Sequence, residues 1–197
     1  MRQDLPTTSY ALLSLLALGD DLTGYELKQR ADRTMRFYWV SPAMSQVYSE
    51  LSRLADHGLV RARGAGPNKR SSRYRITAKG RRELSAWLRD VPAGFPVLKH
   101  PVALRLMMGR LMDPSTTESM LREYICELAE RRADLQAVRD SLRDRDGVDE
   151  PFRYPSMVAD WGLEYFDSER RIVEKLLARL AEESGEGGGT DPTGPAR

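Results

Sequence analysis

The sequence predicts a mainly α-helical fold with one small two-stranded hairpin, divided between two parts of the chain. Three observations support this prediction. Apolar residues recur at steps of three and four through most of the 197 residues, which is the period of an amphipathic helix. In the first half, two short segments of alternating polarity flank a stretch rich in glycine, as the strands of a hairpin do. A proline-rich interval near the middle indicates a connection between domains.

Composition excludes several classes of protein. The sequence has no run of about 18 apolar residues and no basic N-terminal region followed by an apolar block, so we expect a soluble cytoplasmic protein without membrane contact. The single Cys126 excludes a disulfide framework and any multi-cysteine metal site. With His57 and His100 as its only histidines, the chain is not expected to hold a metal, and nothing in it calls for a cofactor.

Charge is distributed unevenly along the chain. Residues 1–90 contain 16 Lys and Arg against 9 Asp and Glu, a net charge of +7. The remaining residues contain 15 basic and 20 acidic side chains, a net charge of −5. We therefore expect only the first part to meet a polyanion.

Four helices and a hairpin are predicted in the first part. Each helix follows a residue suited to cap it: Ser9, Thr23, Ser41 with Pro42 at the first helical position, and Thr77. The helices are predicted over 9–18, 24–35, 42–57 and 78–89. Segments 59–63 and 72–76 alternate like half-buried strands, so the pair predicts a hairpin whose tip bears Lys69, Arg70 and Arg73.

The second part is predicted to be helical throughout. Three prolines place a linker at 91–101, which separates a first domain over 1–90 from a helical domain over 102–183. Helices are predicted in that domain over 102–112, 115–145 and from Pro155 or Ser156 to 183. The tail 184–197 has almost no apolar residues and is expected to be disordered.

The helix over 42–57 has the strongest functional pattern. Its apolar residues form one buried stripe, whereas the opposite face carries Ser45, Gln46, Ser49, Ser52, Arg53 and Asp56. Short side chains let a helix backbone approach base edges, and Gln46 is suited to a bidentate contact with adenine. The order helix, helix, helix, hairpin, helix predicts a winged helix-turn-helix, with a recognition helix in the major groove and a basic wing on the phosphates.

The same residues resemble the PadR family of bacterial transcriptional regulators. The resemblance rests on TGYELKQR at 23–30, on FYWVSPAMSQVYSELSRLADHGLV at 37–60 and on SSRYRITAKGRREL at 71–84. Where many family members have proline after the tyrosine of the recognition helix, this chain has Ser49. The long C-terminal half is similar to the larger subfamily, in which that half is a helical dimerisation domain.

The resemblance implies a homodimeric regulator of double-stranded DNA, commonly a repressor that a small molecule or another signal releases from its operator, which we expect to be palindromic. Carried over by position, the DNA-facing residues are Ser41, Ser45, Gln46, Tyr48, Ser49, Lys69, Arg70 and Arg73. Tyr48 has either a DNA contact or a packing role, since tyrosine has an apolar ring and a polar tip.

Methionines and aromatic residues at helical spacing in the second part allow more than one interpretation. Met107, Met108, Trp161 and Tyr165 fit a core or a dimer interface, and they also fit an adaptable apolar pocket for an effector.

Three other classes of function fit the sequence less well. An enzyme is not expected, because no phosphate-binding loop, nucleophile elbow or catalytic residue is evident. A winged helix that binds only protein would need an apolar patch on the recognition helix, where this chain is polar. A MarR-like regulator would share the DNA chemistry, but it usually has dimerisation helices at both ends.

Overall fold

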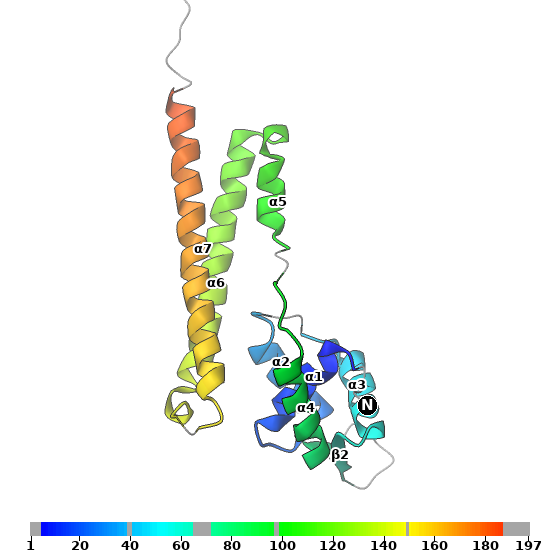
Figure 1. The fold of residues 1–197 in the computed structure, drawn as a ribbon. Helices are drawn as coiled ribbons and strands as arrows, with labels where there is room; N and C mark the ends of the chain where they lie inside the picture. The colour runs from blue at the N-terminus through cyan, green and yellow to red at the C-terminus, as the bar shows by residue number, and fades with distance from the viewer. Residues whose placement is uncertain (1–4, 39–40, 65–71, 97–98, 149, 187–197) are drawn as a thin grey trace, which may run out of the picture. The chain divides into compact units, whose positions relative to one another are not determined.

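The computed structural model describes residues 5–38, 41–64, 72–96, 99–148 and 150–186. The chain divides into two compact units (Figure 1). The first comprises Met1–Phe95 with Arg145–Arg153, and the second, called the helical unit below, comprises Pro96–Asp144 with Tyr154–Arg197.

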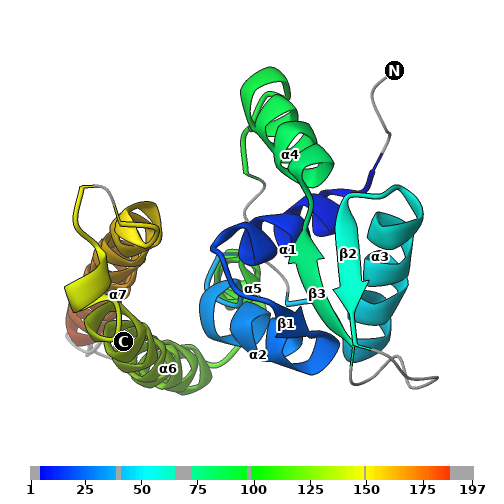
Figure 2. The same cartoon turned by 90° about the horizontal axis from the view of Figure 1, so that it is seen from below.

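The first unit combines four helices with a small antiparallel sheet. In chain order its elements are α1 (Thr7–Ala17), β1 (Leu22–Thr23), α2 (Gly24–Thr34), α3 (Met44–Asp56), β2 (Val60–Arg63), β3 (Arg73–Ile76) and α4 (Ala78–Asp90). The strands lie in the order β1-β3-β2, with α3 next to the sheet (Figure 2). This arrangement confirms the mainly α-helical fold with a winged helix-turn-helix in the first part.

The sheet has three strands where the sequence predicted two. The short β1 pairs with β3, with Leu22 opposite Tyr74 and Thr23 opposite Arg73. β3 is thereby bordered on both sides, since it also pairs with β2. A strand of two residues leaves no alternation to detect, which is why the pattern did not indicate it.

The predicted caps are correct for two helices and wrong for two. Thr23 caps α2 in a reciprocal capping box with Glu26, and the Thr77 hydroxyl accepts from the Gly80 amide at 3.0 Å at the start of α4. By contrast, α1 begins at Thr7 and α3 at Met44, so neither Ser9 nor Ser41 is a cap. Both serine hydroxyls instead donate to carboxylates on other helices.

Leucines from α1, α2 and α3 form the core of the first unit. The most deeply buried side chains are Leu12, Leu13, Leu16, Leu27, Val47, Leu51, Leu54 and Leu59. Burying each such side chain contributes roughly 1.5–3 kcal/mol. α3 is thus fixed along its apolar stripe by both other helices of the bundle, and its opposite face is left to solvent.

The helical unit consists of two long helices and a short one. α5 (Pro101–Met107) is followed by a 3-10 turn, η1 (Gly109–Leu111), then α6 (Pro114–Asp140) and α7 (Arg153–Glu186). The single helix predicted over 102–112 is therefore two shorter elements. α7 continues three residues into the tail that was expected to be disordered at 184–197, and residues from 187 onward lie outside the described part.

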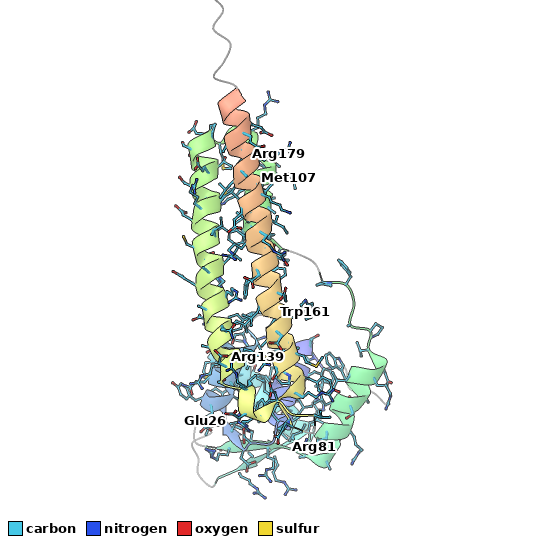
Figure 3. All side chains as sticks on the ribbon, turned by 90° about the vertical axis from the view of Figure 1, so that its left-hand side faces the viewer. Glu26, Arg81, Met107, Arg139, Trp161 and Arg179 are labelled. Atoms are coloured by element: carbon cyan, nitrogen blue, oxygen red, sulfur yellow. The ribbon has the colours of Figure 1, made fainter. Side chains whose placement is uncertain are left out.

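α6 and α7 lie side by side in opposite directions (Figures 1 and 3). α6 buries Leu121, Leu128 and Leu135, which recur every seven residues, as in a coiled-coil seam. Two ion pairs set the register between the helices: Arg132 Nε to Asp167 Oδ1 at 2.8 Å and Arg139 Nε to Asp160 Oδ1 at 2.7 Å. The hydrogen bond from Arg132 lowers the pKa of Asp167.

None of the helices in the described ranges contains a segment both long enough and apolar enough to cross a membrane.

Candidate nucleic-acid interface

α3 presents a continuous polar face to solvent. Its exposed side chains are Ser45, Gln46, Ser49, Ser52, Arg53 and Asp56. With 13 residues, the helix is about 20 Å long. The Ser49 hydroxyl donates to the Gln46 carbonyl at 2.9 Å, so it can offer only its lone pairs to a ligand. The structure therefore brings together three of the predicted site residues, Ser45, Gln46 and Ser49.

Glu50 anchors α3 from its inner side. The Glu50 carboxylate is only 5% exposed, and it accepts a hydrogen bond from the buried Ser9 hydroxyl of α1. Arg53 Nη1 lies 3.2 Å from the other carboxylate oxygen of Glu50. This cluster was not predicted from the sequence, although one signal for it was present. Glu50 occupies a position of the apolar stripe, three residues after Val47 and four before Leu54.

Ser41 lies before α3 and is bound to α2. Its hydroxyl donates to Asp32 Oδ1 at 2.6 Å and accepts from Lys28 Nζ at 3.4 Å. Hydrogen bonds from Lys28 first, and then from Ser41, lower the pKa of Asp32. α3 therefore begins later than predicted. The backbone amides that lack a helical partner are those following Ala43, and not those following Ser41.

The Tyr48 ring packs between α2 and α3. A Cβ atom placed on Gly24 would lie 2.5 Å from Tyr48 Cε1, so the ring occupies the space that only glycine leaves free. Tyr48 also lines a groove of about 870 Å³ between α2, α3 and the sheet, together with Tyr25 and Tyr74. Burial, with Tyr48 as a further contributor, raises the pKa of Tyr74. The packing role of the ring is thus present, and it leaves the phenol at the edge of the interface.

Replacing Gly24 with alanine is expected to displace the Tyr48 ring and to lower the free energy of unfolding by about 1 kcal/mol. The cost is moderate because the far end of a side chain can shift more easily than backbone. Tyr48→Leu should remove the conflict, so Gly24→Ala in that background should be nearly neutral. Chemical unfolding of the four proteins measures this coupling, and equal costs in both backgrounds would contradict the contact.

The wing places its basic residues differently from the prediction. Arg73 is the first residue of β3 and not part of the hairpin tip. Its guanidinium donates to the Asp21 carbonyl at 2.8 Å and to Glu26 Oε1 at 3.1 Å. Lys69 and Arg70 lie outside the described residues. The sequence analysis also missed three exposed arginines of the wing strands, Arg61, Arg63 and Arg75.

Two family models match consecutive parts of the chain. The model of the transcriptional regulator PadR-like family matches residues 12–86, and that of the virulence activator alpha C-terminal domain matches residues 98–181. The chain is thus similar to the PadR-like family over most of its first unit. A curated relative, the negative transcriptional regulator PadR of Bacillus subtilis (strain 168), is 28% identical over 140 residues. The alignment covers 69% of this chain and 65% of that relative.

Solved structures of PadR-like proteins share the fold. Bacillus subtilis PadR in complex with operator DNA matches with a TM-score of 0.75 and 22% identity, over 89% of this chain and 99% of that one. The same protein in complex with p-coumaric acid matches with a TM-score of 0.74 and 23% identity, over 89% and 99%. A PadR-like regulator from Bacillus cereus matches with a TM-score of 0.75 and 19% identity, over 89% and 98%. These relatives are regulators and not enzymes.

The four predicted effector residues do not line one pocket in the described part of the chain. Met107, Met108, Trp161 and Tyr165 are all exposed. Figure 3 shows Met107 near the level of Arg179, whereas Trp161 lies 18 residues earlier on α7, roughly 27 Å away along the axis. None of the four lines the cavity of about 920 Å³ between η1, the start of α6 and the end of α7.

His100 has partners that the sequence analysis missed. Its Nδ1 accepts from the Ala103 amide at 3.1 Å and thereby caps α5, while its Nε2 lies 2.7 Å from Glu169 Oε1 of α7. The Tyr124 hydroxyl of α6 lies 3.2 Å from the same nitrogen. Burial, and next the Glu169 charge, raise the pKa of Tyr124. The cluster joins all three helices of the unit at the start of α5. In the described residues, no three His, Cys, Asp or Glu side chains gather as metal ligands would.

Proposed function

We propose that this chain is a sequence-specific DNA-binding regulator, which binds a palindromic operator as a homodimer and represses transcription. α3 is the recognition helix of this proposal and enters the major groove. Ser45, Gln46 and Ser49 face the base edges, and Lys69, Arg70 and Arg73 of the wing contact phosphates. The operator complex of Bacillus subtilis PadR, which shares the fold, supports this use of the domain.

The observation that carries the proposal is the outward face of α3. Its apolar stripe and Glu50 hold the helix to the core, while every exposed side chain on the other face is polar and most are short. Such a face lets the backbone approach base edges and offers hydroxyl and amide groups for hydrogen bonds. A face that docked onto protein would expose large apolar side chains, and this one exposes none.

The homodimer part of the proposal rests on α7. Its inner side packs against α6 through Leu163, Phe166 and Val173. Its opposite side is also apolar, with Tyr154, Val158, Trp161, Tyr165 and Ile172 exposed. These five residues, called the α7 stripe below, follow the three-and-four spacing of a helix–helix seam. A stripe of this kind fits the same stripe of a second copy, because a two-fold dimer buries one patch against itself.

Repression and release by a small molecule are the finer parts of the proposal. The curated relative is a negative regulator, and the Bacillus subtilis protein has been solved with p-coumaric acid. A ligand that favours a different dimer geometry would prevent both recognition helices from reaching their half-sites. Titrating phenolic acids into the preformed operator complex tests this step, and release by none of them would leave the effector class open to a wider search.

The experiment that tests the function is binding of the full-length protein to its own upstream intergenic DNA in a salt series. Saturable binding that survives excess unrelated DNA is the expected result. Binding that unrelated DNA removes equally well would contradict sequence recognition. No binding at low salt would favour the protein-interaction role instead.

Replacing Gln46 with alanine is expected to remove preference at one base pair of each half-site. Bidentate contacts of this type contribute about 1–3 kcal/mol of discrimination against the wrong base. Affinity should be measured for both proteins on the operator and on duplexes with single substitutions. Substituting one A·T pair of the operator should lower the affinity of wild-type protein and leave the affinity of Gln46→Ala unchanged. Equal losses by both proteins at every position would exclude Gln46 from base recognition.

A further inference from the structure

The wing strands carry four arginines on one face. In the β2–β3 pairing, Arg61 lies opposite Arg75 and Arg63 lies opposite Arg73. All four side chains are exposed, whereas Val60, Tyr74 and Ile76 point to the core. Directly opposite residues of an antiparallel pair have Cβ atoms about 4.5–5.5 Å apart, and like charges at that distance destabilise the pair.

Among the described residues, only two of these four arginines have acidic partners. Asp21 forms an ion pair with Arg75 through its carboxylate, and Glu26 Oε1 lies 3.1 Å from Arg73 Nη2. Asp21 directly precedes β1 and Glu26 lies in the first turn of α2, so both acids reach β3, the strand next to β1, and not β2. Within the described residues, Arg61 and Arg63 of β2 have no acidic partner.

We propose that Arg61 and Arg63 form a phosphate-binding site for the backbone of duplex DNA, beside the segment that α3 contacts. Asp21 and Glu26 act as internal counter-ions that keep Arg75 and Arg73 from contributing fully. The inference rests on the proposed function, since it assigns further contacts to the same DNA-binding unit. A bound phosphate would supply the negative charge that Arg61 and Arg63 lack, and it would offset the repulsion between the opposed arginines.

The test is the salt dependence of binding by the full-length protein, measured between 50 and 200 mM salt. Each phosphate contact contributes about 0.9 to the slope of log affinity against log salt. Arg61→Gln with Arg63→Gln should therefore lower the slope by about 1.8, which reduces the affinity ratio across this range by about 12-fold. The loss should be the same on operator and on unrelated duplex of equal length, since phosphates carry no sequence information.

Two further variants sharpen the test. Arg82→Gln with Arg89→Gln removes the same charge from exposed positions of α4 and should change the slope much less. Asp21→Asn releases Arg75 from its counter-ion and should steepen the slope. A thermal melt of each variant checks folding, and the Arg61 and Arg63 substitutions should not lower the melting temperature, because they remove like-charge contacts.

The possible outcomes distinguish failure of the phosphate site from failure of the proposed function. If the double wing variant keeps the wild-type slope, or changes no more than the α4 control, the phosphate site is refuted while operator recognition stands. If wild-type protein shows no operator preference, the proposed function fails. The slope on unrelated duplex then still decides whether Arg61 and Arg63 contact phosphate. Binding to an acidic protein without any change in DNA slope would also refute the site.

Discussion

Replacing Trp161 with glutamate is expected to make the protein monomeric and to weaken operator binding by roughly 10²–10⁴-fold. Trp161 is 71% exposed at the centre of the α7 stripe. A carboxylate there would have to be buried without a partner in the dimer, which costs several kcal/mol. Once the dimer is lost, binding at one half-site no longer holds a second DNA-binding unit at high effective concentration near the other half-site. Analytical ultracentrifugation and operator titration of the same samples measure both effects.

Ala178→Glu is the matched control for this variant. It also adds a carboxylate to an exposed position of α7, but outside the α7 stripe. The control should remain dimeric and bind the operator normally. If Trp161→Glu stays dimeric with full operator affinity but no longer responds to a ligand, the tryptophan belongs to an effector site instead. A dimeric, fully responsive variant would remove Trp161 from both roles.

Replacing Ser9 with alanine is expected to lower the free energy of unfolding by about 1.5–3 kcal/mol. Ser9 is fully buried, and its hydroxyl donates to the buried Glu50 carboxylate on α3. Without that donor, the carboxylate keeps only Arg53 as a charged partner, and an incompletely satisfied buried charge is costly. Urea unfolding measures the change in stability. Operator affinity should also fall, because α3 loses its polar connection to α1.

Two variants control for the loss of a hydroxyl and for the charge. Ser14→Ala, on the exposed side of the same helix, should be nearly neutral, since that hydroxyl donates only to backbone carbonyls of its own helix. Adding Glu50→Met to Ser9→Ala should restore part of the lost stability, because no buried charge then remains. Additive costs of the two substitutions would show that Ser9 and Glu50 do not interact.

The sequence predicted the four helices and the hairpin of the first unit because their signals are local. Thr23 with Glu26 three residues later is a complete capping signal, and the apolar stripe of α3 is visible within the 13 residues of that helix. Ser9 was misread for the opposite reason. A serine before an apolar run looks like a cap, and its real partner, Glu50, lies 41 residues away. Nothing local distinguishes a buried hydrogen bond of that kind from a cap.

The candidate site was predictable where it depends on one helix and not where it depends on neighbouring strands. Gln46 and the serines beside it share a face by helical period alone. The opposition of Arg61 to Arg75 depends on strand register, and the pairing of Arg73 with Glu26 depends on the short β1. The four proposed effector residues were grouped by residue type, but Met107 and Trp161 lie on different helices at different levels.

The two apolar sides of α7 have a consequence for how regulation would respond to gene dosage. Its inner side packs against α6 within one chain, whereas in the proposed dimer its outer side packs against a second copy. Below the dissociation constant of such a dimer, dimer concentration rises with the square of chain concentration. A twofold change in synthesis would then change the supply of operator-competent protein about fourfold. The response of the promoter to chain concentration would thus be steeper than linear. Substitutions in α7, far from any base, could change that steepness.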